Sequence, residues 1–393
     1  MQKLKEWIFN YKFILLIFSL LGVIVSLQRY LPAHTFLGRF SYYNNYILFK
    51  SSILHLLNNQ DMYIAYEQEG AWDLYKYSPT FAVFMLPYAF LPDWAGIILW
   101  NLTNILLVFW AITKLPFLSD KNKKLMLWFI LPELVLSAQS IQSNALIAAL
   151  FLLSYISFER SKLVQAALFI GIATCIKPYA AIAGIIFLFY PNKIKFILAS
   201  LASAILFIAL PLLLTSFSNL VAQYQSWFNM LSNDYSTSTG ISVMALVNDI
   251  SKTPIDKKII IALGSLVTFS TLVFYKRYKD YNFRIQFVAL LLLWVVIFNH
   301  KSESPTFIIP VVGIALWYFN ATFSRFNLFL LFLVLIFTQL SASDIFPPYV
   351  RHEIFEKIHI KVIPCFIAWG VIIFNIYRDN FRQSKFSIEE SIA

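Results

Sequence analysis

Long runs of apolar residues, separated by short polar segments, recur along the whole chain. A membrane-spanning helix needs about 20 mainly apolar residues, or fewer where flanking side chains snorkel or the helix is broken. This criterion predicts helices at 13–28, 95–115, 125–139, 141–158, 163–177, 179–190, 195–215, 259–275, 285–299, 305–320, 327–341 and 362–377. We therefore predict an all-α polytopic membrane protein with about 12 transmembrane helices, forming one integral membrane domain over 1–393.

Prolines interrupt or flank several of these segments, among them Pro132, Pro178, Pro211 and Pro310. Broken helices are tolerated in membranes where they line a cavity in the protein rather than lipid. The apolar run 79–91 is too short to span comfortably. We interpret it as a half-helix that returns to the interface.

Basic residues set the expected orientation, because cytoplasmic loops carry an excess of Lys and Arg. With the N-terminus inside, most of the 31 basic residues fall on the cytoplasmic side. Both termini are then cytoplasmic, including the tail 379–393, and the longer segments 31–78, 216–258 and 342–361 are external. Long loops are more often functional than connective. We therefore expect a plasma (inner) membrane protein whose active face is external or periplasmic.

Composition supports the membrane assignment. The chain is 59% hydrophobic and only 13% charged, whereas soluble domains carry about 25% charged residues. The net charge of +11 needs no nucleic-acid partner, because the anionic cytoplasmic leaflet attracts basic loops. The two cysteines indicate neither a disulfide framework nor a metal cluster.

The first external loop, 31–78, carries the most informative pattern. Tyr46, Phe49, Ile53 and Leu56-Leu57 recur at helical spacing, which predicts an amphipathic helix lying parallel to the membrane. A Tyr-x-Tyr-Ser-Pro turn and a short apolar segment ending in Leu91-Pro92 follow it.

Four later elements continue this order. They are Gln142-Ser143-Asn144 before an apolar helix, Lys177-Pro178 at the outer end of a predicted span, and two weaker stretches, QYQSWF at 223–228 and NHKSESPTFIIP at 299–310. Together with the first loop, they resemble the glycosyltransferase family 87 membrane proteins, also called the DUF2029 family, of the GT-C superfamily. In the family element Gly-Gln-x-Asn, Ile141 stands here where Gly is usual.

The resemblance implies a GT-C-like fold and an inverting hexosyltransferase. Its donor is expected to be a polyprenyl-phosphate sugar, mannose-like, and its acceptor a lipid-linked or envelope glycan or glycolipid. Membrane lipids are the other expected partners, and no metal or soluble cofactor is expected. The sugar, the acceptor, the linkage and the oligomeric state are not specified by the sequence.

The expected general base departs from the family pattern. Relatives typically place an Asp about a dozen residues before the Leu-Leu pair, and that position here is Asn45. An amide can orient a hydroxyl but cannot accept its proton. Two interpretations stay open: Asp61 or Asp73 in the same loop has taken over, or this protein does not catalyse the family reaction.

The remaining candidate residues follow from the chemistry of glycosyl transfer. A departing phosphate needs positive charge, and the candidates are Lys76, Lys177, His300 and Lys301. Expected substrate-lining residues are Tyr46, Tyr75, Tyr77, Gln142 and Asn144. Each has a structural alternative: lysines can anchor at the interface, tyrosines can belong to the aromatic belt, and Asp73 can pair with Lys76.

Two alternative functions belong to other classes. A transporter or flippase of lipid-linked glycans would typically show internal repeats and midplane charges; we detect no repeat, and the charged residues gather at one face. A non-catalytic family member that binds glycolipid is consistent with Asn45.

Overall fold

The computed structural model describes residues 7–32, 41–66, 69–70, 73–234, 239–253 and 255–392, with side chains given for all of these except 234 and 382–392. Parts of the first loop and of the C-terminal tail, both singled out above, therefore lie outside the described residues. The chain is 77% helix, with no strand among the described residues. The prediction of an all-helical protein is confirmed.

Every predicted apolar segment overlaps a helix. Within the described ranges, four helices are long and apolar enough to cross a membrane, judged by length and composition: Tyr11–Tyr30, Asp93–Thr113, Lys193–Leu213 and Val362–Phe381. The same ranges hold six shorter apolar helices of 10–17 residues. These helices support a membrane protein, while the number of spans stays a prediction.

The chain divides into two compact units. Unit 1 comprises Met1–Phe117, Leu134–Gly184 and Ile194–Ser238. Its helices are α2 (Tyr11–Tyr30), α3 (Asn44–Leu57), α4 (Pro79–Phe84), α5 (Leu86–Ala89), α6 (Asp93–Thr113), the C-terminal part of α7 (Asp120–Gln139), α8 (Asn144–Glu159), α9 (Leu163–Ile176), the first part of η2 (Pro178–Phe189), α10 (Lys193–Ala209), η3 (Leu210–Leu213) and α11 (Phe217–Asp234).

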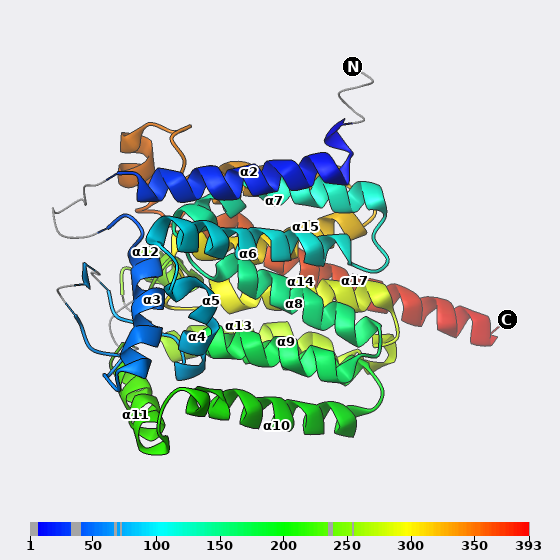
Figure 1. Ribbon diagram of the computed structural model, residues 1–393. Coiled ribbons are helices and arrows are strands. Elements are labelled where there is room, and N and C mark those ends of the chain that lie inside the picture. The colour runs from blue at the N-terminus through cyan, green and yellow to red at the C-terminus, as the bar shows by residue number, and fades with distance from the viewer. Residues whose placement is uncertain are drawn as a thin grey trace. The chain divides into compact units, whose positions relative to one another are not determined.

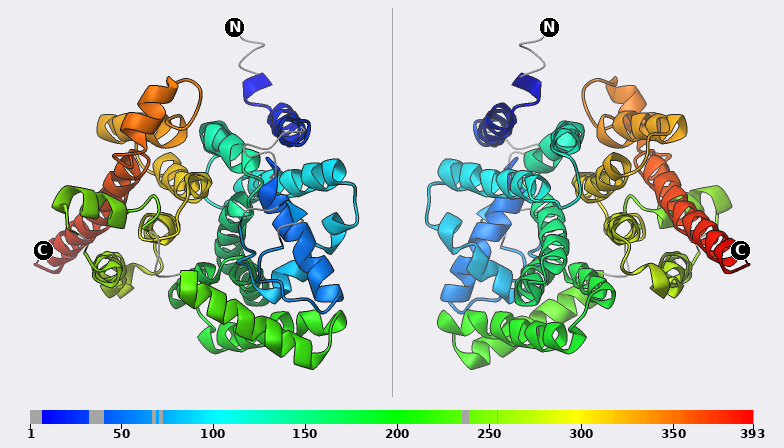
Figure 2. Two further views of the ribbon diagram at one scale, coloured as in Figure 1. Left: turned by 90° about the vertical axis from the view of Figure 1, so that its left-hand side faces the viewer. Right: turned by 90° about the vertical axis from the view of Figure 1, so that its right-hand side faces the viewer.

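The helix α3 occupies the place predicted for the amphipathic helix. Its residues Phe49, Ile53 and Leu56 are fully buried. In Figure 1, α3 crosses the direction shared by α2, α6, α8, α9 and α10, and in Figure 2, where α2 is seen nearly end-on, α3 is seen from the side. This crossing supports an orientation along the membrane surface, which stays a prediction.

The apolar run 79–91 forms two short helices rather than one span. The first, α4, begins with Pro79 at its first turn and is capped by the Ser78 hydroxyl. The second, α5, contains only four residues and has Pro87 in its first turn. The pair is far shorter than the roughly 20 residues needed to cross a bilayer, as the sequence predicts.

Unit 2 comprises Leu118–Glu133, Ile185–Lys193 and Thr239–Ala393. Besides the beginning of α7 and the end of η2, it contains α12 (Val243–Ser251), α13 (Lys257–Ser270), η4 (Thr271–Val273), η5 (Tyr275–Arg277), α14 (Tyr281–Ile297), η6 (Ser304–Phe307), α15 (Ile308–Asn320), α16 (Arg325–Leu333), the π-helices η7 (Val334–Gln339) and η8 (Val350–Phe355), and α17 (Val362–Ile392). The helix α14 is the core of this unit, because all but three of its residues are buried, and α15 and α17 pack against it.

Candidate functional site

A helix break in unit 1 positions Lys177. The helix α9 ends at Ile176, and Lys177 is extended, with φ −137° and ψ 114°. The cause is Pro178, because proline disfavours helical geometry in the residue before it. The chain continues as the 3₁₀ helix η2, so the lysine side chain leaves the backbone at an interruption between two helices.

The Lys177 ammonium is held by an amide pair from the α7–α8 turn. Its Nζ donates to Asn144 Oδ1 at 2.8 Å and lies 6.0 Å from the centre of the Tyr179 ring. The amide of Asn144, which is fully buried, donates in turn to Gln142 Oε1 at 2.5 Å. Three predicted site residues, Gln142 and Asn144 of one turn and Lys177 from 33 positions beyond Asn144, therefore form one hydrogen-bonded chain.

Asn45 is also hydrogen-bonded to the α7–α8 turn. Its Nδ2 donates to the carbonyl oxygen of Ser140 at 2.7 Å, and Trp100 Nε1 donates to the carbonyl oxygen of Ile141 at 3.2 Å. These bonds link the start of α3 and the middle of α6 to the turn that follows α7. Asn45 acts here as a hydrogen-bond donor, a role that a carboxylate at this position could not fill.

Two of the three predicted substrate-lining tyrosines, Tyr46 and Tyr75, donate hydrogen bonds from their hydroxyl groups to backbone carbonyl oxygens. Tyr46 is fully buried and donates to the carbonyl oxygen of Tyr88 at 3.0 Å. It packs against Gly96, where a Cβ would lie only 1.7 Å from its hydroxyl. Tyr75 is buried and donates to the carbonyl oxygen of Ser78 at 3.0 Å.

The third, Tyr77, belongs to a row of aromatic rings. Its ring centre lies 4.6 Å from that of Phe81 and 5.7 Å from that of Tyr75, and the Tyr75 ring is 5.6 Å from that of Tyr63. The row therefore runs from Phe81 at the start of α4 to Tyr63 in the first loop.

The row ends at a polar cavity of about 440 Å³ in unit 1. Side chains from the loop and from α11 line it: Tyr63, Leu74, Lys76, Ser226, Asn229, Met230 and Asn233. Hydroxyl and amide groups can both donate to and accept from the hydroxyls of a sugar. The volume falls within the range of about 300–1,000 Å³ typical of small-molecule sites.

The two aspartates that the sequence singled out each contact a residue lining this cavity. Asp61 Oδ2 accepts from the Ser226 hydroxyl at 2.7 Å, and its Oδ1 accepts from the Tyr63 backbone N–H at 2.9 Å. Asp73 Oδ1 lies 3.0 Å from the Lys76 ammonium, with both side chains about one-third exposed. The expected pairing of Asp73 with Lys76 is therefore present.

Burial raises the pKa of Tyr63, which lines the cavity, well above the ordinary value for tyrosine. It does the same for Tyr75, whose ring lies next to that of Tyr63. Both phenols therefore stay protonated at physiological pH. The Tyr63 hydroxyl donates to the carbonyl oxygen of Tyr77 at 2.9 Å, which fixes the loop around the cavity.

His300 and Lys301, the remaining phosphate candidates, lie in unit 2 in the turn between α14 and η6. The turn is held by Ile241, whose backbone N–H donates to the carbonyl oxygen of Ser302 at 2.7 Å. Gly240 has φ +55°, and a Cβ there would lie 2.8 Å from the carbonyl oxygen of His300. Only glycine fits this close approach, which positions the turn.

Sequence reasoning missed Tyr179 and the polar face of α11. Tyr179 directly follows the Lys177-Pro178 element, which was the available signal. Ser226, Asn229 and Asn233 recur at i, i+3 and i+7 in a stretch that the sequence analysis assigned to an external segment. That spacing places them on one face of a helix.

The described residues include no candidate metal site. Among the described residues, no group of three or more His, Cys, Asp or Glu side chains is placed to hold a metal ion.

Comparison with known proteins assigns the family. No curated protein matches the chain. Residues 75–284, more than half of the 393, match the family model of glycosyltransferase family 87, a range that covers Lys76, Tyr77, Gln142, Asn144 and Lys177. The suspected resemblance is confirmed, and this membrane protein belongs to glycosyltransferase family 87.

Proposed function

We propose that this glycosyltransferase moves a hexose from a polyprenyl-phosphate sugar to a lipid-linked or envelope glycan on the external face of the membrane. The observation that carries the proposal is the arrangement in unit 1. This unit holds a lysine at a helix break, a row of tyrosines, and a polar cavity two of whose lining residues, Ser226 and Lys76, contact carboxylates. Both termini would then be cytoplasmic.

Lys177 is assigned to the donor phosphate. As the glycosidic bond to the phosphate breaks, negative charge develops on the leaving oxygen, and a fixed ammonium stabilises that charge. Asn144 holds the ammonium in place at 2.8 Å. A lipid-borne donor suits this position, because the lysine lies at the end of an apolar helix, where a polyprenyl chain can lie alongside in the bilayer.

The acceptor sugar is assigned to the cavity lined by Tyr63, Lys76 and the polar face of α11. Asp61 is assigned as the base, because its partner Ser226 lines the cavity and its two hydrogen bonds fix the carboxylate. Asp73 is instead engaged by Lys76. In the proposed step, Asp61 takes the acceptor proton as the hydroxyl attacks the anomeric carbon. Asn45 has a positioning role through Ser140.

Transfer of radiolabelled hexose from polyprenyl-phosphate mannose or glucose to extracted envelope lipids tests the proposal. We expect Lys177→Ala and Asp61→Asn each to lower kcat by at least about 100-fold, the effect of losing a group that acts in the transition state. Lys195→Ala is the matched control, since Lys195 is an exposed lysine at the start of α10, and it should leave transfer unchanged.

The outcomes separate the parts of the proposal. If Asp73→Asn abolishes transfer while Asp61→Asn does not, the assignment of the base is overturned. Full turnover in Lys177→Ala would remove that lysine from the site. Binding of the donor by the wild type without any transfer would overturn the catalytic assignment in favour of glycolipid binding or transport.

A further inference from the structure

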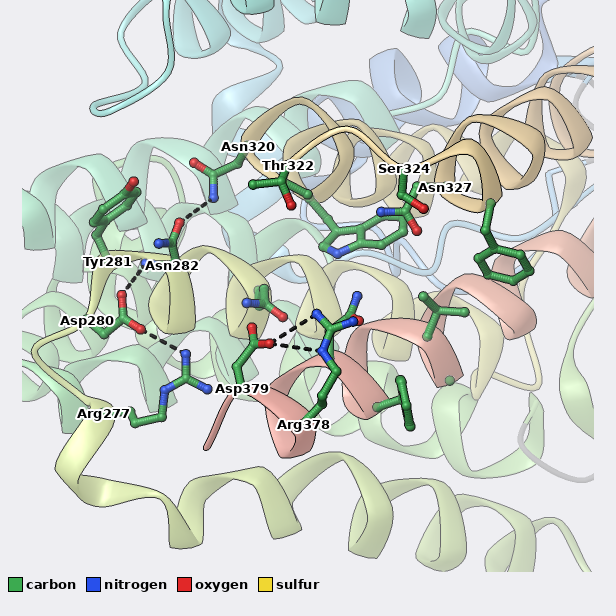
Figure 3. Close-up of a pocket in the computed structure, with 18 of the residues that line it drawn as sticks. Arg277, Asp280, Tyr281, Asn282, Asn320, Thr322, Ser324, Asn327, Arg378 and Asp379 are labelled. Atoms are coloured by element: carbon green, nitrogen blue, oxygen red, sulfur yellow. Dashed lines mark hydrogen bonds and ion pairs between the residues drawn. The ribbon is translucent and has the colours of Figure 1, made fainter. Parts of the chain in front are cut away.

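A second cavity, of about 1010 Å³, lies in unit 2 at the end of α14 opposite to the His300–Lys301 turn. It is bounded by the start of α14, the end of α15, the α15–α16 connection and residues 367–379 of α17 (Figure 3). The proposed transfer reaction uses none of its residues. By the orientation proposed above, it faces the cytoplasmic leaflet.

Charged and amide side chains form the polar end of this cavity. Arg277 donates to Asp280 at 2.8 Å, and Arg378 donates to Asp379 at 3.0 Å. Figure 3 shows both pairs with Asn320 nearby, which donates to Asn282 at 3.0 Å. The two cations and two anions balance, so the charged groups lining the cavity have no net charge.

The other end of the cavity is apolar and runs along α17. Ile367, Gly370, Val371 and Phe374 line it, with Trp317 of α15 opposite. A Cβ at Gly370 would meet no atom within 4 Å. The cavity is therefore amphipathic, with its polar end at the helix ends, where lipid headgroups lie, and its apolar end towards the bilayer core.

We propose that this cavity binds one phospholipid whose headgroup carries both a phosphate and a primary ammonium, of the phosphatidylethanolamine class. The ammonium donates to the carboxylates of Asp280 and Asp379, while the phosphate accepts from the Arg378 guanidinium. An anionic lipid would match only the arginines. A choline headgroup carries the same charges but has no N–H to donate.

Native mass spectrometry of the delipidated full chain, titrated with dioleoyl phosphatidylethanolamine, phosphatidylcholine or phosphatidylglycerol, tests this. We expect one ethanolamine lipid to bind at least about tenfold more tightly than either other lipid, equivalent to about 1.4 kcal/mol. Gly370→Leu should fill the apolar end and weaken this binding at least tenfold. Gly184→Leu is the matched control, because Gly184 is also open at its Cβ and lies outside the cavity.

Asp379→Ala, which removes a carboxylate acceptor that is 32% exposed, supplies a second variant with a different signature. It should abolish the preference for ethanolamine over choline while the thermal-unfolding midpoint shows that the protein is folded. Equal binding of all three lipids by the wild type, or unchanged binding in Gly370→Leu, would overturn the proposal. No sugar donor is present, so the result is independent of the proposed transfer activity.

Discussion

At the scale of single residues, Asn45 shows what the sequence could and could not predict. Its place in the first loop was found by counting from Leu56-Leu57, but its partner was not. The amide donates to the carbonyl oxygen of Ser140, 95 positions away. Such a contact depends on tertiary packing, whereas the missing carboxylate could be read from residue type alone.

Asn45→Asp should therefore impair this protein, even though it restores the usual family residue. An ionised carboxylate cannot donate to the Ser140 carbonyl, and two oxygens would face each other at the 2.7 Å separation of the present bond. We expect a loss of about 1–3 kcal/mol in the free energy of unfolding and reduced transfer. Thermal unfolding in detergent measures the first.

Asn45→Ala separates the two effects of that change, because it removes the donor without adding a charge. We expect it to be more stable than Asn45→Asp. A wild-type midpoint in the Asp variant, with full or raised transfer, would show instead that this position can act as the base.

At the scale of elements, helix positions were predictable because the hydropathy signal is local. The backbone geometry of the junctions between helices was not predictable, and the α7–α8 turn shows the reason. Ile141 is fully buried and has φ +52°, the left-handed region that a β-branched residue rarely adopts. The expected family Gly at this position now has a conformational basis, because glycine adopts this geometry without strain.

Comparing Ile141→Gly with Ile141→Ala tests whether the turn is strained. Both variants lose the buried side chain, but only glycine relieves the positive φ. We expect Ile141→Gly to be about 1 kcal/mol more stable than Ile141→Ala, the reverse of the usual order within a helix. Thermal midpoints of the two purified variants measure the difference. The opposite order would mean that the turn adapts to an L-residue at no cost.

At the scale of the whole molecule, the sequence predicted the class, the helices and the family, and it placed Gln142, Asn144 and Lys177 among the site residues. It did not predict which of them meet. Lys177 binds Asn144 across 33 positions, and Asp61 binds Ser226 across 165. Hydropathy depends on neighbours in sequence, whereas these contacts depend on how helices pack. Ion pairs between buried side chains could not be predicted from the sequence either.

The last prediction concerns the buried ion pair between Glu133 and Lys361, which are 228 positions apart in the sequence. In unit 2, Lys361 Nζ lies 2.8 Å from Glu133 Oε1, and the two side chains are 6% and 0% exposed. The ammonium also donates to Ser304 Oγ at 3.0 Å. Removing one partner of a buried ion pair leaves an uncompensated charge, at a cost of about 3–5 kcal/mol. We therefore expect Lys361→Met alone to unfold at a much lower temperature than the wild type.

The double variant Glu133→Leu with Lys361→Met decides whether the charges themselves matter. Replacing both partners by apolar side chains removes the unpaired charge and should recover most of the stability that Lys361→Met loses. Thermal midpoints of the wild type, both single variants and the double variant complete the cycle. If the double variant is as unstable as the sum of the singles, the pair is not coupled. Recovery would instead show that it joins the start of unit 2 to its last helix by charge compensation, whatever reaction unit 1 catalyses.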